Sequence, residues 1–351
     1  MRTDTMRNAL LWLSRKIGYP LVAPSVIQLS LTYRCNLRCK MCSIANMAPK
    51  EDELSTNVIM RAIDQGHRYG IPELLLTGGE PFLREDIFSI CDYAHNLGMR
   101  SIVTTNAAII DDRIAQKIAQ SQVSHIHVSL DGLEETHDFF RGAGTYKKAA
   151  EAISFLNQKR HNGRFFSLGV ACTVMDKNVR QLSELVALAD AMGVDVINFQ
   201  PLVNDNANFL DHGRPAFWLR DDDIAVLAEE IQKIKAYKAK HITVYEEPPL
   251  SLLEPYYRGT LTRADWVCFG GFKTVFICFE KGQPLVYSCH GICGNLTYGS
   301  LIKAWKSHEA RMLRRHSRSC THLCLQSCYS RYNSQSLRRI ASAVIRKAKH
   351  G

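Results

Sequence analysis

The sequence predicts an α/β fold, in which a partial (β/α)6 barrel is followed by a small cysteine-rich α+β domain. Between about residues 25 and 200, six apolar strand-like runs alternate with amphipathic helical segments. This alternation indicates a parallel sheet with helices outside it. Seven of the 12 cysteines then lie between residues 268 and 328. Six strands are too few for a closed eight-unit barrel, so we expect a partial, TIM-like one, and the pattern alone also permits an open doubly wound sheet.

The expected strands are short runs rich in Val, Ile and Leu, at residues 26–31, 73–77, 101–105, 125–130, 167–173 and 194–200. The expected helices between them carry apolar residues at helical spacing, at residues 58–69, 86–97, 111–120, 146–158 and 179–192. Glycines at positions 70, 98 and 193 follow three of these helices, where a left-handed residue commonly ends a helix. A further helix is expected near residues 221–237.

We divide the chain into an amphipathic N-terminal segment (1–24), the barrel (25–240), the cysteine-rich domain (241–332) and a basic amphipathic tail (333–351). The composition, 46% hydrophobic and 22% charged over 351 residues, is that of a folded chain. No apolar run approaches the ~20 residues that cross a bilayer, and the N-terminus lacks the features of a secretory signal. We therefore expect a cytoplasmic location.

The net charge of +10 is concentrated at the C-terminal end of the chain. Residues 301–351 contain twelve Lys or Arg and a single acidic residue, Glu309. The amphipathic stretches at both ends of the chain are similar to helices that lie on anionic lipid, which makes a membrane surface one expected partner. A basic tail without a membrane role is the alternative. No nucleic-acid-binding motif is present, so nucleic acid is not expected as a partner.

Cys35, Cys39 and Cys42 follow directly on the first expected strand. Parallel α/β folds carry their chemistry beyond the carboxyl ends of the strands. Three thiolates in one loop can hold three irons of a [4Fe–4S] cluster, and the fourth iron is then left without a protein ligand, as in a catalytic metal site. A zinc site is the alternative, but no further Cys or His follows within twenty residues.

The spacing of these three cysteines, their place after the first strand and the Thr-Gly-Gly-Glu-Pro run at residues 77–81 resemble the radical S-adenosylmethionine (SAM) superfamily, over about residues 25–200. The resemblance implies that SAM chelates the open iron through its amino and carboxylate groups. It also implies that one electron cleaves SAM to methionine and a 5′-deoxyadenosyl radical. A one-electron reductant such as flavodoxin or ferredoxin is the implied partner. Met41 stands where the family often has an aromatic residue.

The resemblance further implies that SAM is bound by residues at the ends of successive strands. Arg141 resembles an arginine that pairs with the SAM carboxylate, a geometry suited to guanidinium. His125 and His127 share a strand face with Ser129 and are expected to be interior residues rather than catalytic ones. The expected SAM-binding residues are Gly78, Gly79, Glu80, Pro81, Asn106, Ser129, Asp131, Arg141, Thr173 and Gln200.

The C-terminal cysteines resemble the SPASM or twitch domains of the same superfamily, which hold auxiliary iron–sulfur clusters. The Cys-x2-Cys-x5-Cys-x3-Cys run of a full SPASM domain is absent, so one auxiliary [4Fe–4S] cluster is expected. Cys278 and Cys293 are either spare or complete a second cluster. A zinc-stabilised module is the alternative. The expected ligands are Cys268 and Cys289 with two or three of Cys320, Cys324 and Cys328.

Together these features predict a radical SAM enzyme that abstracts hydrogen from an unidentified peptide, sugar or lipid-linked substrate. If the auxiliary cluster accepts the electron left on the substrate, the outcome is an oxidation or a crosslink. If a free cysteine such as Cys278 or Cys293 returns a hydrogen instead, the outcome is an epimerisation. The alternative from another class is a non-catalytic, cysteine-rich metal-binding scaffold.

Overall fold

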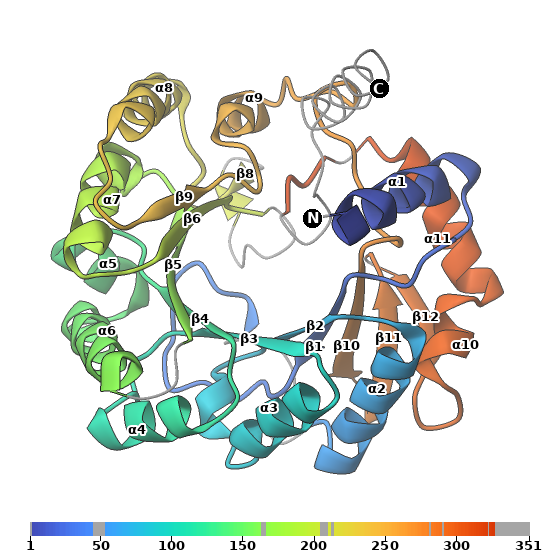
Figure 1. Cartoon of the computed structure of the whole chain (residues 1–351). Coiled ribbons are helices and arrows are strands. Elements are labelled where there is room, and N and C mark those ends of the chain that lie inside the picture. The colour runs from blue at the N-terminus through green and yellow to red at the C-terminus, as the bar shows by residue number, and fades with distance from the viewer. Residues whose placement is uncertain are drawn as a thin grey trace, which may run out of the picture.

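The computed structural model describes residues 2–44, 53–162, 166–203, 210–211, 214–280, 282–289, 291–321 and 323–326. Its main sheet has ten strands in the order β12-β11-β10-β1-β2-β3-β4-β5-β6-β9. The strands curve into an arc that helices cover from outside, and the arc stays open between β9 and β10 (Figure 1). The predicted α/β partial barrel is therefore confirmed.

The first six strands agree with the expected ones to within two residues at each end. Adjacent strands pair in parallel, with Ile27 opposite Leu74 for example. Ile27 is fully buried against Gly66 of the neighbouring helix, so Gln28 and Ser30 face the inside of the barrel by strand alternation. The strands are β1 (Val26–Ser30), β2 (Glu73–Thr77), β3 (Arg100–Thr105), β4 (His125–Ser129), β5 (Ser167–Val174) and β6 (Val196–Pro201).

Helices connect these strands and form the outer layer of the barrel (Figure 1). Local signals fix their ends: Ser55 caps α2 by accepting a hydrogen bond from the Val58 N–H, and Gly70 ends that helix in the left-handed region. The expected helix at 179–192 is a 3₁₀ turn, η3 (Val179–Gln181), followed by α7 (Leu182–Ala191). The others are α2 (Thr56–Tyr69), α3 (Ile87–Asn96), α4 (Asp112–Gln120), α5 (Glu134–Arg141), α6 (Thr145–Asn162) and α8 (Asp221–Ala236), with the 3₁₀ turn η2 (Pro81–Leu83).

The C-terminal half of the chain extends the sheet at both edges. Strand β9 (Thr243–Tyr245) pairs in parallel with β6, and β10 (Thr274–Glu280) pairs in parallel with β1. Eight neighbouring strands are therefore parallel, two more than expected, and the sheet runs across the boundary placed at residue 240. The remaining elements are β7 (Leu210–Asp211), β8 (Arg214–Pro215), η5 (Leu250–Leu252), α9 (Leu253–Arg258), β11 (Gln283–Ser288), β12 (Gly291–Asn295), α10 (Leu301–Trp305) and α11 (His308–Ser319).

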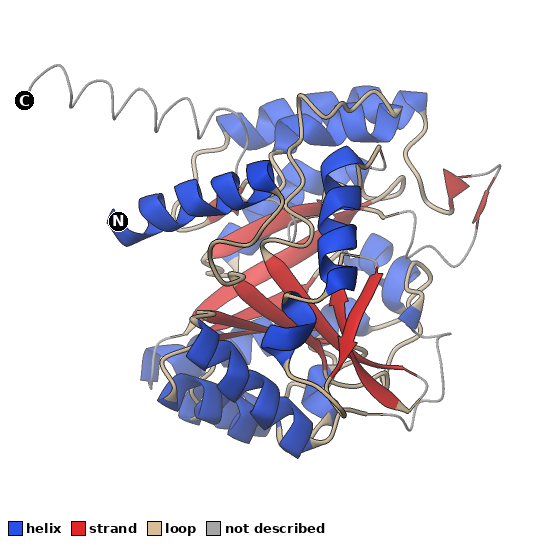
Figure 2. Cartoon of the chain, turned by 90° about the vertical axis from the view of Figure 1, so that its right-hand side faces the viewer, coloured by secondary structure: helices blue, strands red, loops and turns tan. Residues whose placement is uncertain are grey.

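The N-terminal segment forms a helix, α1 (Arg2–Ile17), at the periphery of the molecule beside α11 (Figures 1 and 2). The two helices are joined by a 2.7 Å hydrogen bond from Arg318 Nη2 to the Lys16 carbonyl. Among the residues described, no helix is long and apolar enough to cross a membrane. The tail at 333–351 lies outside the described residues, and the four-part division of the chain stays a prediction.

Candidate active site

Cys35, Cys39 and Cys42 line one cavity of about 310 Å³. The cavity lies at the carboxyl ends of the parallel strands, where such folds place their chemistry. Each of β2 to β6 contributes polar or small residues to its wall, as do the cysteine loop and α5. Predicted SAM-binding residues that line it are Gly78, Gly79, Asn106, Ser129, Arg141, Thr173 and Gln200. Lining residues that the sequence did not single out include Thr104 of β3 and Leu202, which directly follows β6.

The two glycines after β2 allow its loop to pack against the chain that enters the cysteine loop. The Gly79 N–H donates to the Thr32 carbonyl at 2.7 Å, and the Glu80 N–H donates to the Arg34 carbonyl at 2.8 Å. A Cβ atom on Gly79 would lie 2.1 Å from the Arg34 carbonyl oxygen. Backbone-to-backbone packing therefore requires glycine here, in addition to any role in binding SAM.

Glu80 is fully buried, and its carboxylate faces the end of β3. It accepts hydrogen bonds from Thr105 Oγ1 at 2.8 Å, from the Asn106 N–H at 2.8 Å and from the Phe82 N–H at 3.1 Å. Burial raises the Glu80 pKa to about 6, against the opposing effect of these donors. Asn106 in turn donates from Nδ2 to Cys35 Sγ at 3.6 Å. Glu80 and the neighbouring Pro81 thus lie behind the wall, where Glu80 positions Asn106.

Arg141 is oriented by a buried carboxylate. Its Nε donates to Asp131 Oδ2 at 2.6 Å, and Asp131 is fully buried. The other Asp131 oxygen accepts a hydrogen bond from the Thr173 N–H at 2.8 Å. Burial raises the Cys39 pKa to about 11, an effect that the nearby Arg141 charge opposes. Asp131 therefore joins the ends of two strands and holds a cation beside the thiols, although it does not itself line the cavity.

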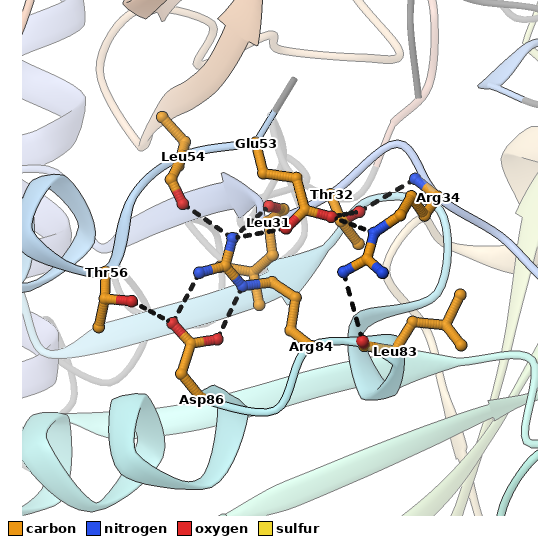
Figure 3. A network of polar contacts seen from close by, with 9 residues as sticks. All are labelled: Leu31, Thr32, Arg34, Glu53, Leu54, Thr56, Leu83, Arg84 and Asp86. Carbon is orange, nitrogen blue, oxygen red and sulfur yellow. Dashed lines mark hydrogen bonds and ion pairs between the residues drawn. The ribbon is translucent and has the colours of Figure 1, made fainter. Parts of the chain in front are cut away.

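Buried Arg84 contacts the chain that leads into the cysteine loop and the chain that follows it (Figure 3). Arg84 donates to the Leu31 carbonyl at 3.1 Å and to the Leu54 carbonyl at 2.8 Å, and it pairs with Asp86. It also contacts Glu53, which accepts hydrogen bonds from Thr32 and Arg34 just before Cys35 (Figure 3). No sequence pattern predicts this network, since only the fold shows that Arg84, four positions after Glu80, is buried.

Three of the described C-terminal cysteines form a group. Cys268, Cys289 and Cys324 lie close together. A Cβ atom on Gly270 would be 3.2 Å from Cys268 Sγ and 3.4 Å from Cys289 Sγ. Burial first, and then the neighbouring Cys324 and Cys289, raise the Cys268 pKa to about 12. We call these three residues the auxiliary cysteine set.

The remaining C-terminal cysteines are placed differently. Cys320 caps the end of α11, and Cys328 lies outside the described residues. Cys278 lies on β10, hydrogen-bonded to the Tyr33 and Tyr287 side chains. Cys293 lies on β12, where it is buried near Arg314. The structure thus separates Cys278 and Cys293 from the auxiliary cysteine set.

The all-cysteine composition of both sites fits iron–sulfur clusters. Each thiolate of a [4Fe–4S] cluster binds a different iron, so the sulfurs need not converge on one point. Within the described ranges, no three His, Cys, Asp or Glu side chains form a group that could hold a single metal ion. Three thiols on one loop, around an open cavity, suit a cluster with one iron free for another ligand.

Comparison with known proteins identifies the domain that carries the cavity. Residues 29–197 match the family described as the radical SAM superfamily. The chain contains a radical SAM domain. That match confirms the predicted class and the expectation of an enzyme, whose reaction is left open, and it implies a [4Fe–4S] cluster and SAM. A non-catalytic scaffold is not favoured.

Two relatives with different named activities each match about half of this chain. An Fe-coproporphyrin III synthase of Methanosarcina barkeri is 34% identical over 180 residues, which cover 51% of this chain and 44% of the relative. A mycofactocin maturase, MftC, of Mycobacterium ulcerans is 32% identical over 191 residues, covering 54% and 50%. The chain thus spans about half the length of these relatives.

Solved structures extend the likeness in fold over most of the chain. Streptococcus suis SuiB bound to S-adenosylmethionine superposes with a TM-score of 0.67 at 16% identity, covering 93% of this chain and 77% of SuiB. Native anSMEcpe with bound AdoMet superposes with a TM-score of 0.63 at 15% identity, covering 87% and 88%. At these identities the likeness concerns the fold, which supports the predicted partial barrel.

Proposed function

We propose that this enzyme cleaves SAM reductively at a [4Fe–4S] cluster held by Cys35, Cys39 and Cys42, and abstracts hydrogen from an organic substrate. When bound, the cluster and SAM supply one electron and a 5′-deoxyadenosyl radical. The observation that carries the proposal is the shared cavity, in which the three thiols meet polar residues from the ends of β2 to β6 and Arg141.

The side chains around the cavity contact different parts of SAM. Arg141, held in place by Asp131, pairs with the SAM carboxylate. Asn106 both contacts Cys35 and presents polar atoms to the cavity wall. Met41 and Leu202 provide apolar contacts suited to the adenine ring. Ser129, Thr173 and Gln200 complete the wall with hydrogen-bonding groups.

The auxiliary cysteine set, with Cys320 or Cys328, holds a second [4Fe–4S] cluster that accepts the electron left on the substrate after hydrogen abstraction. Strand β10 joins the two cysteine sites. Its Ile277 pairs with Leu29 of β1, close to the start of the cysteine loop, whereas its first residue, Thr274, follows Cys268 by six positions. The strand has seven residues, a length of roughly 23 Å. Electron removal of this kind produces an oxidation or a crosslink.

A peptide is one substrate class that has support in the comparisons. One relative is a mycofactocin maturase. SuiB has been solved bound to its precursor peptide SuiA, in a structure that covers 89% of this chain. Other relatives are named as heme and porphyrin synthases, so a tetrapyrrole is the second class to test. A sugar or lipid-linked substrate, a flavodoxin or ferredoxin as reductant and a cytoplasmic location stay predictions.

An epimerisation is the second candidate reaction, favoured by the place of Cys278. This thiol is separate from the auxiliary cysteine set and is hydrogen-bonded to Tyr33, two residues before Cys35. Its S–H bond would give a hydrogen atom to the substrate radical, and the resulting thiyl would regain one electron from the reductant and one proton from solvent. Incorporation of one solvent deuterium into the product would distinguish this reaction from an oxidation.

Anaerobic incubation of the full chain with SAM and dithionite tests the proposal. We expect 5′-deoxyadenosine and methionine as products, and about eight iron and eight sulfide per chain for two clusters. Replacement of Cys35, Cys39 and Cys42 by Ala should abolish 5′-deoxyadenosine and lower iron to about four. Cys91→Ala, in the barrel core, is the matched control and should change neither quantity.

Two results would contradict separate parts of this proposal. Unchanged 5′-deoxyadenosine in the triple variant would remove the assignment of the cysteine loop. Iron near four in the unaltered protein would remove the auxiliary cluster and leave SAM cleavage in place.

A further inference from the structure

The N-terminal helix α1 and the turn after it expose an unusual amount of apolar surface. Six large apolar side chains between residues 6 and 21 are 37% to 65% exposed, whereas other exposed residues of this kind in the described ranges lie singly on β9, β12, the loop after β12 and α11. Helical spacing aligns Met6, Leu13 and Ile17 along one side. We call this the α1 apolar face, consisting of Met6, Trp12, Leu13, Ile17, Tyr19 and Leu21.

The opposite side of α1 is fixed to the rest of the protein. Leu11 is 2% exposed and packs with Phe269 and Phe272. Arg7 donates to the carbonyls of Ala23 and Pro24, at 2.8 and 2.7 Å. Arg15 donates to the carbonyl of Cys268 at 2.6 Å. Because these contacts hold the helix in one orientation, the α1 apolar face is directed outward as a defined surface.

Basic side chains lie on α1 itself and on the neighbouring helix α11. Lys16 is exposed on α1, with its Nζ 5.7 Å from the centre of the Trp12 ring. Arg318 of the neighbouring α11 donates to the Lys16 carbonyl, and Arg311 and Arg315 of the same helix are exposed. Arg311, Arg315 and Arg318 of α11 are opposed by one acidic residue of that helix, Glu309. The partner that fits here therefore combines negative charge with an apolar interior.

We propose that the α1 apolar face lies on an anionic lipid bilayer, with its apolar side chains at the level of the acyl chains. Lys16, Arg311 and Arg315 would then meet lipid headgroups. Trp and Tyr are enriched at the boundary between headgroups and acyl chains, as Trp12 and Tyr19 would be here. This inference is independent of the proposed function, because it concerns where the enzyme works and not its reaction.

Co-sedimentation of the full chain with lipid vesicles tests this proposal. Vesicles of phosphatidylcholine alone are compared with vesicles that also contain phosphatidylglycerol, at low and physiological salt. We expect binding to the anionic vesicles, weakened by salt. Leu13→Glu with Ile17→Glu should lower the partition coefficient by at least about tenfold per residue. Ile292→Glu with Tyr298→Glu, exposed apolar residues elsewhere on the protein, should leave it unchanged.

A charge variant keeps the test decisive if the double variant fails to fold. Lys16→Glu changes an exposed side chain and should weaken binding to anionic vesicles by about tenfold or more. Absence of binding by the unaltered chain at both salt concentrations would overturn the proposal, as would unchanged binding of the folded α1 variants. A dimer, or a complex with an acidic protein, that forms without lipid and is lost in these variants would instead assign the face to that partner. Release of 5′-deoxyadenosine should be unaffected in all variants.

Discussion

The two cysteine sites of this protein are built in opposite ways. Cys35, Cys39 and Cys42 come from eight consecutive residues and line an open cavity. The auxiliary cysteine set comes from three segments separated by more than twenty residues each, and α1 packs against it through Arg15. A site that must admit SAM and a substrate needs an open side, whereas a site that only exchanges electrons does not. Because the auxiliary cysteine set joins distant segments, we expect it to contribute more to the stability of the fold than the cysteine loop does.

The largest expected effect is the loss of stability when the auxiliary site is broken. Cys268→Ala with Cys289→Ala should lower the free energy of unfolding by several kcal/mol, because the proposed cluster would tie together distant segments of the chain. Cys42→Ala should lower it much less, because its loop is already held by Arg84, Glu53 and the Gly79 contact. Anaerobic thermal unfolding of both variants, with iron analysis, measures the difference.

The same two variants should rank in the opposite order when the loss of 5′-deoxyadenosine production is measured. Uncoupled production of 5′-deoxyadenosine should survive in the auxiliary variant and vanish in Cys42→Ala. A Cys42→Ala protein that unfolds at a lower temperature than the auxiliary variant would contradict the comparison.

The second expected effect comes from two glycines, one at each site. In Gly79→Ala the new Cβ would lie 2.1 Å from a backbone oxygen, and backbone cannot move aside cheaply. We expect a cost of about 3 kcal/mol and a displaced cysteine loop, seen as weaker SAM binding in calorimetry. In Gly270→Ala the nearest atom is Cys268 Sγ at 3.2 Å, so a shift of a few tenths of an ångström suffices and about 1 kcal/mol is expected. Equal effects of the two substitutions would show that loop packing is not the reason for Gly79.

Sequence patterns predict many of the residues that line the first site, because its cysteines are close in sequence and its other residues end successive strands. The cysteine spacing and the strand-end rule depend only on chain order, so Asn106, Ser129, Thr173 and Gln200 are found without a structure. The helix α5 was not expected, although Glu134 and Glu135 in its first turn are typical of a helix start. Its eight residues are too few for a periodic pattern to stand out.

The rest of the molecule depends on contacts between distant segments. The sequence predicts that the residues of strand β10 belong to the separate cysteine-rich domain. Only the pairing of β10 with β1 places it in the barrel sheet. Glu80 and Asp131 are predicted as SAM-binding residues, but they lie behind the cavity wall, and their contacts to Asn106 and Arg141 depend on burial. Gly169 of β5 leaves room for two histidine rings, since its Cβ would be 2.7 Å from His127 Nδ1 and 3.0 Å from His125 Nε2. No local signal predicts such an arrangement.

The third expected effect is a pH dependence of stability that arises from the barrel and not from the auxiliary site. Burial, and then the neighbouring His125, lower the His127 pKa to about 3. Above pH 6.5 this histidine is neutral in both the folded and the unfolded chain. As pH falls below 6.5, the unfolded chain binds a proton that the folded chain does not, so stability is lost. Between pH 7.5 and 5.5 the loss is about 1.3 kcal/mol.

Glu80 acts in the opposite direction, since its raised pKa of about 6 means that the folded chain binds its proton first as pH falls. Its contribution to stability is present at low pH and lost as pH rises through about 6. Between pH 7.5 and 5.5 it therefore offsets about 1 kcal/mol of the stability lost through His127. The free energy of unfolding, measured with urea, differs between pH 7.5 and pH 5.5. His127→Gln should therefore remove about 1.3 kcal/mol of that difference. His95→Gln, at an exposed position on α3, is the control and should leave that difference as it is. An unaltered difference in His127→Gln would mean that the ring accepts a proton inside the barrel, where the buried Nδ1 has no hydrogen-bond partner among the described atoms.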